Sequence, residues 1–269
     1  MSSWVITGVS RGLGFEFIRQ LSENPSNAVF GLVRDKAAVE AKVAAEIGRD
    51  NIHIIQADTT DPLALEKATQ YVSERTNGTL DYVIANAALQ AKTALVGFDA
   101  LSRNPKTLDQ DAIDHFRINT LGAIHLFNAF IPLILKGHAK KLIAISSGMS
   151  DPEMTLKADI HQATSYAMSK AALNMAVAKF SAVYREKGVL CMAVCPGAVD
   201  TGSLNIETEE EGQLAMAMFG KFKQYSPTFE GPVKPEDSAR SVLALINKAT
   251  VDGGYAGVFL SHTESKPYL

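Results

Sequence analysis

Cysteine is nearly absent from this chain. Its 269 residues include only Cys191 and Cys195, which lie four positions apart in a short apolar run. At about 3.3 Å per residue a strand separates them by roughly 13 Å, farther than the Cα separation that a disulfide can bridge. Two thiols without further ligands nearby also make a poor metal site. We therefore expect no disulfide and no metal centre, and interpret both thiols as buried on one face of a strand.

Excess positive charge and long apolar runs are missing as well. The formal net charge is −3 and the pI is near 6.1, which provides no basic field for nucleic acid or an anionic membrane. The most apolar stretch, residues 123–135, is interrupted by two polar residues and a proline and falls short of the roughly 18 residues of a spanning helix. No basic segment followed by an apolar run precedes Gly8, so we expect a cytoplasmic protein.

Short apolar runs alternate with helical segments along the whole chain. Apolar residues make up 46% and charged residues 20%, which is typical of globular proteins, and a chain of this length predicts a single domain over residues 1–269. The predicted strands are residues 3–7, 28–33, 52–56, 80–85, 141–146, 189–195 and 255–260. The predicted helices lie near 13–21, 36–47, 62–75, 108–135, 165–187 and 235–248. This α/β alternation predicts a Rossmann-type, doubly wound parallel sheet of seven strands with helices on both faces.

Three stretches depart from this alternation. Residues 89–107 and 202–234 fit neither a strand nor a crossover helix, and residues 148–164 form a long connection. Such loops cover the ligand in an open α/β sheet, beyond the carboxyl ends of the strands. Their methionines and aromatics indicate a bulky apolar ligand or the ordinary packing of a lid. The acidic run 207–211 is interpreted as the start of a helix rather than as a metal site.

A glycine-rich turn joins the first strand to the first helix, with the sequence Thr7-Gly8-Val9-Ser10-Arg11-Gly12-Leu13-Gly14. Glycines allow unusual backbone angles and a close approach to a pyrophosphate, and the helix N-terminus supplies free N–H groups. The predicted cofactor contacts are Gly8, Ser10, Arg11, Gly12 and Leu13. A purely structural turn would explain the same glycines.

The residues after the second strand indicate which dinucleotide binds. An acidic side chain at the end of this strand accepts hydrogen bonds from the ribose of NAD, whereas Arg34 occupies the position here. A guanidinium favours the 2′-phosphate of NADP, and Arg11 adds a second cation. The alternative is that Arg34 is an exposed loop charge, partly offset by Asp35. We predict NADP(H) as the cofactor.

Tyr166 and Lys170 are spaced to share one helix face, four residues apart. A tyrosine titrates near pH 10, and a nearby ammonium favours its phenolate, which lowers the barrier to acid/base exchange. Ser146 and Ser147 end the fifth strand, where a hydroxyl donates to a substrate carbonyl. Serines that merely terminate a strand are the alternative.

The order and spacing of these motifs resemble the short-chain dehydrogenase/reductase family, and are similar to its C-factor-like and sniffer-like carbonyl reductases. The glycine spacing is the one found in that family, and Asn86-Ala87-Ala88 looks like its Asn-Ala-Gly turn with Ala88 in place of glycine. Between Ser147 and Tyr166 the chain is longer than the family usually shows. Further cofactor contacts implied by the resemblance are Asp58, Thr59, Asn86, Ala87, Pro196, Gly197, Val199 and Thr201.

The resemblance also implies roles for the catalytic residues. Tyr166 is the proton donor or acceptor, Lys170 binds the nicotinamide ribose and tunes the tyrosine, and Ser147 rather than Ser146 holds the carbonyl. Asn119, in an Asn-x-x-Gly sequence, bends its helix and holds a water that links Lys170 to solvent. An asparagine that hydrogen-bonds a neighbouring backbone is the alternative for this position.

The expected function is the NADP(H)-dependent reduction of a ketone or aldehyde, by a carbonyl reductase of the short-chain dehydrogenase type. Its partner is a small-molecule carbonyl or alcohol, and the resemblance implies a homodimer or homotetramer. Two alternatives stay open. The same Tyr-Lys pair serves an isomerase or dehydratase, or the protein is an NADP-binding sensor without turnover.

Overall fold

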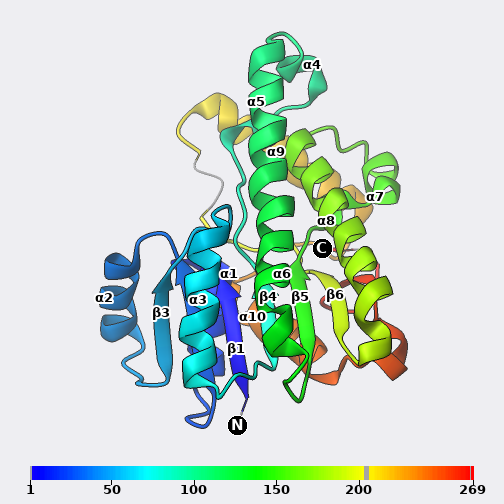
Figure 1. Cartoon of the computed structure of the whole chain (residues 1–269). Coiled ribbons are helices and arrows are strands. Elements are labelled where there is room, and N and C mark those ends of the chain that lie inside the picture. Colours follow the sequence, from blue (N-terminus) through cyan, green and yellow to red (C-terminus); the bar gives the residue numbers. More distant parts are fainter. Residues whose placement is uncertain (1, 203–205, 267) are drawn as a thin grey trace.

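The sheet has seven parallel strands, with a layer of helices on each face (Figure 1). The computed structural model describes residues 2–202, 206–266, 268 and 269. The strands are β1 (Ser3–Thr7), β2 (Ala28–Val33), β3 (Ile52–Gln56), β4 (Tyr82–Ala85), β5 (Lys141–Ile145), β6 (Leu190–Cys195) and β7 (Phe259–Ser261). Their order is β3-β2-β1-β4-β5-β6-β7, and every pair is parallel. The Rossmann-type doubly wound fold is confirmed.

Two apolar cores hold the helices to the sheet. One core lies under α1 (Gly12–Leu21), α2 (Lys36–Glu46) and α10 (Pro235–Lys248), and the other under α3 (Pro62–Arg75), α6 (Gly122–Ile134) and α8 (Thr164–Tyr184). Successive strand residues point to opposite faces: Val5 belongs to the second core, and Trp4 and Ile6 belong to the first. Both faces are therefore apolar, which explains why the strands read as continuous hydrophobic runs.

Helix starts follow the local sequence. Asp35 caps α2 by accepting the amide of Ala38, and Asp61 caps α3, whose first residue is proline. Helix α1 differs, because Arg11 occupies its N-cap and makes no side-chain cap bond. The first amides of α1 are thus left to a ligand.

The strand order reverses at β1, which pairs with β2 on one side and with β4 on the other. Connections from β1 and from β4 therefore leave toward opposite edges of the sheet, and a crevice opens between them beyond the carboxyl ends of the strands. Helix α5 (Pro105–Phe116) rises above this edge in Figure 1. It continues through a π-helical segment, Arg117–Leu121, into α6. The single helix predicted for residues 108–135 is thus interrupted by a widened turn.

The prediction that residues 202–234 form a loop is wrong. Helix α9 (Glu209–Tyr225) lies within this stretch and begins with a capping box in which Thr208 and Glu211 satisfy each other's backbone amides. The interpretation of the acidic run as a helix start is confirmed. The apolar positions of α9 join a third cluster with Met154 and Tyr268, in which the sheet takes part through Cys195 of β6 and Phe259 of β7. Position 203, within the predicted loop, is outside the described residues, as are 204 and 205.

The other predicted loops are partly helical. Residues 89–107 contain η1 (Lys92–Leu95), α4 (Phe98–Leu101) and the start of α5, and residues 148–164 contain η3 (Gly148–Ser150) and α7 (Pro152–Lys157). The last strand, predicted from residue 255, begins only at Phe259, because Tyr255 belongs to the turn Val251–Tyr255 and Gly257 has a φ of 80°. Both cysteines are buried and form no disulfide with each other. No helix in the described part of the chain is long and apolar enough to cross a membrane.

Candidate active site

A cleft of about 850 Å³ opens beyond the carboxyl ends of the strands. It is lined by every residue that the sequence singles out for the cofactor or for catalysis, with the exception of Asn119. Segments from six strand ends converge on it: the glycine turn after β1, Arg34 after β2, Asp58 after β3, Asn86 after β4, Ser147 after β5 and Pro196 after β6. This convergence at one edge is what the parallel sheet dictates.

The glycines of this turn are packed so closely that a side chain at their positions would clash with neighbouring atoms. Gly8 and Gly12 have φ values of 71° and 54°. A Cβ on Gly14 would lie 2.3 Å from the carbonyl oxygen of Gly8. Asn86 locks the turn from β4, because its Nδ2 donates to the carbonyl of Thr7 at 2.9 Å. The side-chain amide of Asn86 therefore stabilises the turn, and the neighbouring Ala87 packs against Gly8.

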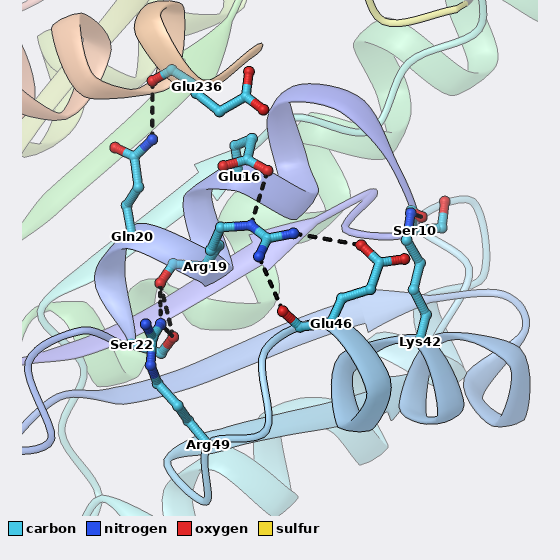
Figure 2. A network of polar contacts seen from close by, with 9 residues as sticks. All are labelled: Ser10, Glu16, Arg19, Gln20, Ser22, Lys42, Glu46, Arg49 and Glu236. Carbon is cyan, nitrogen blue, oxygen red and sulfur yellow. Dashed lines mark hydrogen bonds and ion pairs between the residues drawn. The ribbon is translucent and has the colours of Figure 1, made fainter.

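A polar network on the outer side of α1 braces the same turn (Figure 2). Lys42 on α2 donates from Nζ to the carbonyl oxygen of Ser10 at 3.3 Å. Arg19 on α1 pairs with Glu16 of the same helix at an N–O distance of 3.0 Å, and it links α1 to α2 through Glu46 at 3.4 Å. Lys42 was not predicted from the sequence, because nothing in the local pattern of α2 relates it to a turn more than thirty residues away.

Two arginines supply positive charge at the far end of the cleft. Arg11 and Arg34 are both exposed and both line it. Asp35 does not pair with Arg34, because its carboxylate accepts the Ala38 amide at 3.1 Å as the cap of α2. Among the described residues no salt bridge involves either guanidinium. Asp58 lines the same end, and its Oδ1 accepts from the Thr60 amide and hydroxyl, both at 2.8 Å.

Tyr166, Lys170 and Ser147 meet at the other end. Burial raises the pKa of Tyr166 to about 12, and a hydrogen bond with the Ser147 hydroxyl acts in the opposite direction. Burial also lowers the pKa of Lys170 to about 8. The Lys170 ammonium donates to the carbonyl of Ile145 at 2.7 Å and lies 5.7 Å from the centre of the Tyr166 ring.

The two serines after β5 point to different partners. The Ser146 hydroxyl donates to Oδ1 of Asn174 at 2.6 Å. Ser147 instead contacts the Tyr166 hydroxyl, and its Oγ accepts the Met149 amide at 3.2 Å. This geometry favours Ser147, as the resemblance implied, and leaves Ser146 a structural role.

Asn119 is 2% exposed and lies behind the cleft rather than in it. Its side chain is paired with protein groups: Oδ1 accepts the Leu89 amide at 2.6 Å, and Nδ2 donates to the Leu89 carbonyl at 3.0 Å and to Ser169 Oγ at 2.9 Å. The residue stands in the π-helical turn Arg117–Leu121, at the place where the resemblance implied a bend. The alternative that its amide binds nearby backbone is confirmed for Leu89, and the water relay stays a prediction.

The segment after β6 closes the cleft over the glycine turn. Gly197 has a φ of 84°, and Val199 forms a bridge with Val233. Thr201 packs against Gly12, where an added Cβ would lie 3.0 Å from the threonine Cβ. Pro196, Gly197, Val199 and Thr201 line the cleft, and their contacts with a nicotinamide stay a prediction.

Several residues that line the cleft were not predicted from the sequence. Tyr268 and Leu269, from the end of the described chain, line the cleft, as do Asp114, Arg117 and Gln90. The Tyr268 ring stacks on Phe259 with ring centres 4.9 Å apart, and its carbonyl accepts from Cys195 Sγ at 3.4 Å. No spacing rule connects this tail to β5 or β6, so an isolated aromatic was its only signal.

Known proteins resemble this chain over its whole length. A sequence model described as short chain dehydrogenase matches residues 3–212. Short chain dehydrogenase virK of Hypocrea virens is 46% identical, with 100% of both chains covered. Among solved structures, the NADPH-bound carbonyl reductase from chicken fatty liver is 26% identical, with a TM-score of 0.76 and 98% of both chains covered. The carbonyl reductase Sniffer of D. melanogaster, 22% identical with a TM-score of 0.77 and 98% of both chains covered, shares the fold.

Proposed function

Because this chain belongs to the short-chain dehydrogenase family, we propose that it is an NADP(H)-dependent reductase that converts a ketone or aldehyde into an alcohol. One observation carries the proposal: Tyr166, Ser147 and Lys170 meet in the same cleft as the glycine turn. An acid/base group, a hydroxyl for the carbonyl and a dinucleotide cradle in one cavity are what carbonyl reduction requires. The NADPH-bound carbonyl reductase of chicken supports the choice of reaction.

The residues present fit a dinucleotide phosphate. The positive φ of Gly8 and Gly12 and the uncapped start of α1 leave main-chain N–H groups for a pyrophosphate. Arg11 and Arg34 hold a 2′-phosphate, which is why we favour NADP(H) over NAD(H). When bound, the nicotinamide supplies or accepts the hydride at the carbonyl carbon.

The chain's own residues handle the carbonyl oxygen. Ser147 donates a hydrogen bond that positions this oxygen, and negative charge develops there as the carbonyl is reduced. Tyr166 then delivers its phenolic proton. With a pKa of about 12 it is protonated at neutral pH, and an alkoxide is a stronger base than a phenolate. Lys170 holds the ribose and supplies positive charge next to the phenol.

Apolar side chains gather at the substrate end of the cleft. Residues lining it from the segments after β5, from α9 and the segment after it, and from the tail are Met149, Met154, Met218, Phe219, Phe222, Pro232, Tyr268 and Leu269. None of them offers a cation to a carboxylate or a phosphate. We therefore propose a neutral, bulky apolar carbonyl compound as the substrate.

A carbonyl panel with NADPH tests the proposed function. The near-ultraviolet absorbance of NADPH is expected to fall in proportion to the alcohol formed, with neutral aromatic ketones preferred over analogues of equal size that carry a carboxylate. Product formation without loss of NADPH would favour an isomerase or dehydratase. Binding of NADPH with neither product nor oxidation across the panel would favour the sensor.

Replacing Arg34 tests the cofactor assignment. In Arg34→Ala the KM for NADPH is expected to rise about tenfold or more, because a charge-assisted hydrogen bond is lost, while the KM for NADH changes less than about twofold. Arg103→Ala is the matched control, since Arg103 is exposed and does not line the cleft. Equal effects of Arg34→Ala on both cofactors would refute the assignment.

A further inference from the structure

A row of three polar side chains on α5 and the turn after it faces the segment that follows β4. Asp111, His115 and Asn119 are spaced four residues apart, so they lie on one side of the helix. Their partners on the facing segment are Leu89, Ala91 and Thr93, every second residue, in the opposite direction. The two stretches therefore run antiparallel and in register.

Each rung of this pairing has its own chemistry. The Leu89 amide donates to Asn119 Oδ1 at 2.6 Å, and the Thr93 hydroxyl donates to Asp111 Oδ1, also at 2.6 Å. In the middle the Ala91 amide points at His115 Nε2 at 3.5 Å. An amide only donates, so Nε2 accepts, and the imidazole proton resides on Nδ1. Nδ1 then donates to the Asp111 carbonyl at 2.8 Å.

The row is buried, so the loss of one of its hydrogen bonds would leave a polar group unpaired and away from water. The side chains of His115 and Asp111 are 1% and 8% exposed, and Asn119 is 2% exposed. Polar groups withdrawn from water in this way are costly unless they are paired. Asp111 Oδ2 has no hydrogen-bond partner among the described residues. If these positions only packed α5 against the core, apolar residues would be sufficient there.

The row also connects the facing segment with the proton donor. The His115 ring meets the Tyr166 ring edge to face, with centres 6.4 Å apart at an angle of 80°. Leu89 and Gln90 of the facing segment line the cleft. His115 thus contacts Tyr166 on one side and holds a wall of the cleft on the other.

We propose that Asp111 and His115 are positioning residues that extend Asn119 into a clamp, the row Asp111-His115-Asn119 on residues 89–93. The clamp fixes the wall formed by Leu89 and Gln90 and braces the Tyr166 ring, so it controls how well a carbonyl is presented to the phenol. Its effect on turnover rests on the proposed function. Its effect on the backbone of residues 89–93 does not.

Hydrogen exchange at the clamped amides gives a readout independent of activity. In His115→Leu the Ala91 amide loses its acceptor, and its exchange is expected to quicken about fivefold, while amides of β4 keep their rates. His115→Gln carries an acceptor at a similar distance along the side chain and is expected to restore most of the protection. Unchanged Ala91 exchange in a folded His115→Leu protein overturns the clamp.

Steady-state kinetics test the role in positioning. His115→Leu is expected to lower kcat/KM for the carbonyl substrate about tenfold, with recovery in His115→Gln and with a Kd for NADPH within about twofold of the original. If exchange responds but kcat/KM does not, the segment is clamped without any role in presenting the substrate, and the positioning proposal fails. If no carbonyl is reduced by the unaltered protein, the proposed function fails and the exchange result stands.

A milder pair of variants covers the case in which His115→Leu does not fold. Thr93→Val removes only the loop hydroxyl at the end of the clamp, and Asp111→Leu removes the acceptor of that hydroxyl while keeping a similar side-chain size. Since the two side chains share one hydrogen bond, the double variant is expected to be no worse in kcat/KM or exchange than the more damaging single variant. Effects that multiply would overturn this rung.

Discussion

Tyr166→Phe is expected to lower kcat for carbonyl reduction about a thousandfold and to leave the Kd for NADPH within about twofold of its original value. The phenol is the proton source of the proposed reaction, and phenylalanine keeps the ring while removing that proton. The glycine turn and the two arginines lie at the other end of the cleft, so cofactor binding has little reason to change.

Matched variants separate this effect from damage to helix α8. Tyr184→Phe alters a tyrosine on the same helix whose ring packs on Phe180, and it is expected to keep full activity. Ser147→Ala removes the carbonyl-positioning hydroxyl and is expected to lower kcat about a hundredfold. Stopped-flow and steady-state absorbance of NADPH measure all three variants. A Tyr166→Phe protein that retains a tenth or more of its kcat would refute the assignment of the acid.

The pH dependence follows from the same residue. Because the phenol of the cofactor-free chain has a pKa of about 12, reduction should not be limited by loss of the Tyr166 proton between pH 6 and 9. Oxidation of the alcohol needs the phenolate and should therefore rise with pH over that range.

Sheet and cleft could be predicted from the sequence because their signals are local. A parallel strand buried on both faces is a short apolar run, and the motifs after each strand must meet once the strands are parallel. Gly8, Arg34, Asp58, Asn86 and Ser147 illustrate this, since each lies within two residues of the end of its strand and all line one cleft. Where the local rule was strong, as in α3 and α10, even the helix bounds were correct.

What could not be predicted depends on contacts between distant segments. Helix α9 packs into a small cluster with Met154 and Tyr268, in which Cys195 and Phe259 are the strand residues, so its apolar positions gave no pattern that fitted a crossover. Asn119 was placed at the catalytic centre by resemblance, yet its amide binds Leu89, thirty residues earlier. No spacing of residues along the chain announces such a pair.

Lys170 combines a functional charge with a cost to stability. The side chain is 2% exposed, and burial lowers the pKa of its ammonium from 10.5 to about 8. Below pH 8 the folded chain without cofactor therefore carries a buried charge that the unfolded chain would keep in water. The penalty is complete below the folded pKa and disappears as the pH rises to the unfolded value. It amounts to about 3 kcal/mol at pH 7 and roughly half of that at pH 9.5.

Lys170→Met is accordingly expected to raise stability while abolishing activity. After about 1 kcal/mol is lost with the hydrogen bond to Ile145, the cofactor-free variant should gain about 2 kcal/mol at pH 7, a Tm increase of several degrees. The gain should shrink toward pH 9.5, and kcat/KM with NADPH should fall at least a hundredfold, since ribose binding and the charge beside Tyr166 disappear together. Calorimetry at both pH values and the NADPH assay measure the two effects. Lys179→Met, on the exposed side of α8, should change neither, and a Lys170→Met protein that is less stable at pH 7 would contradict the buried-charge account.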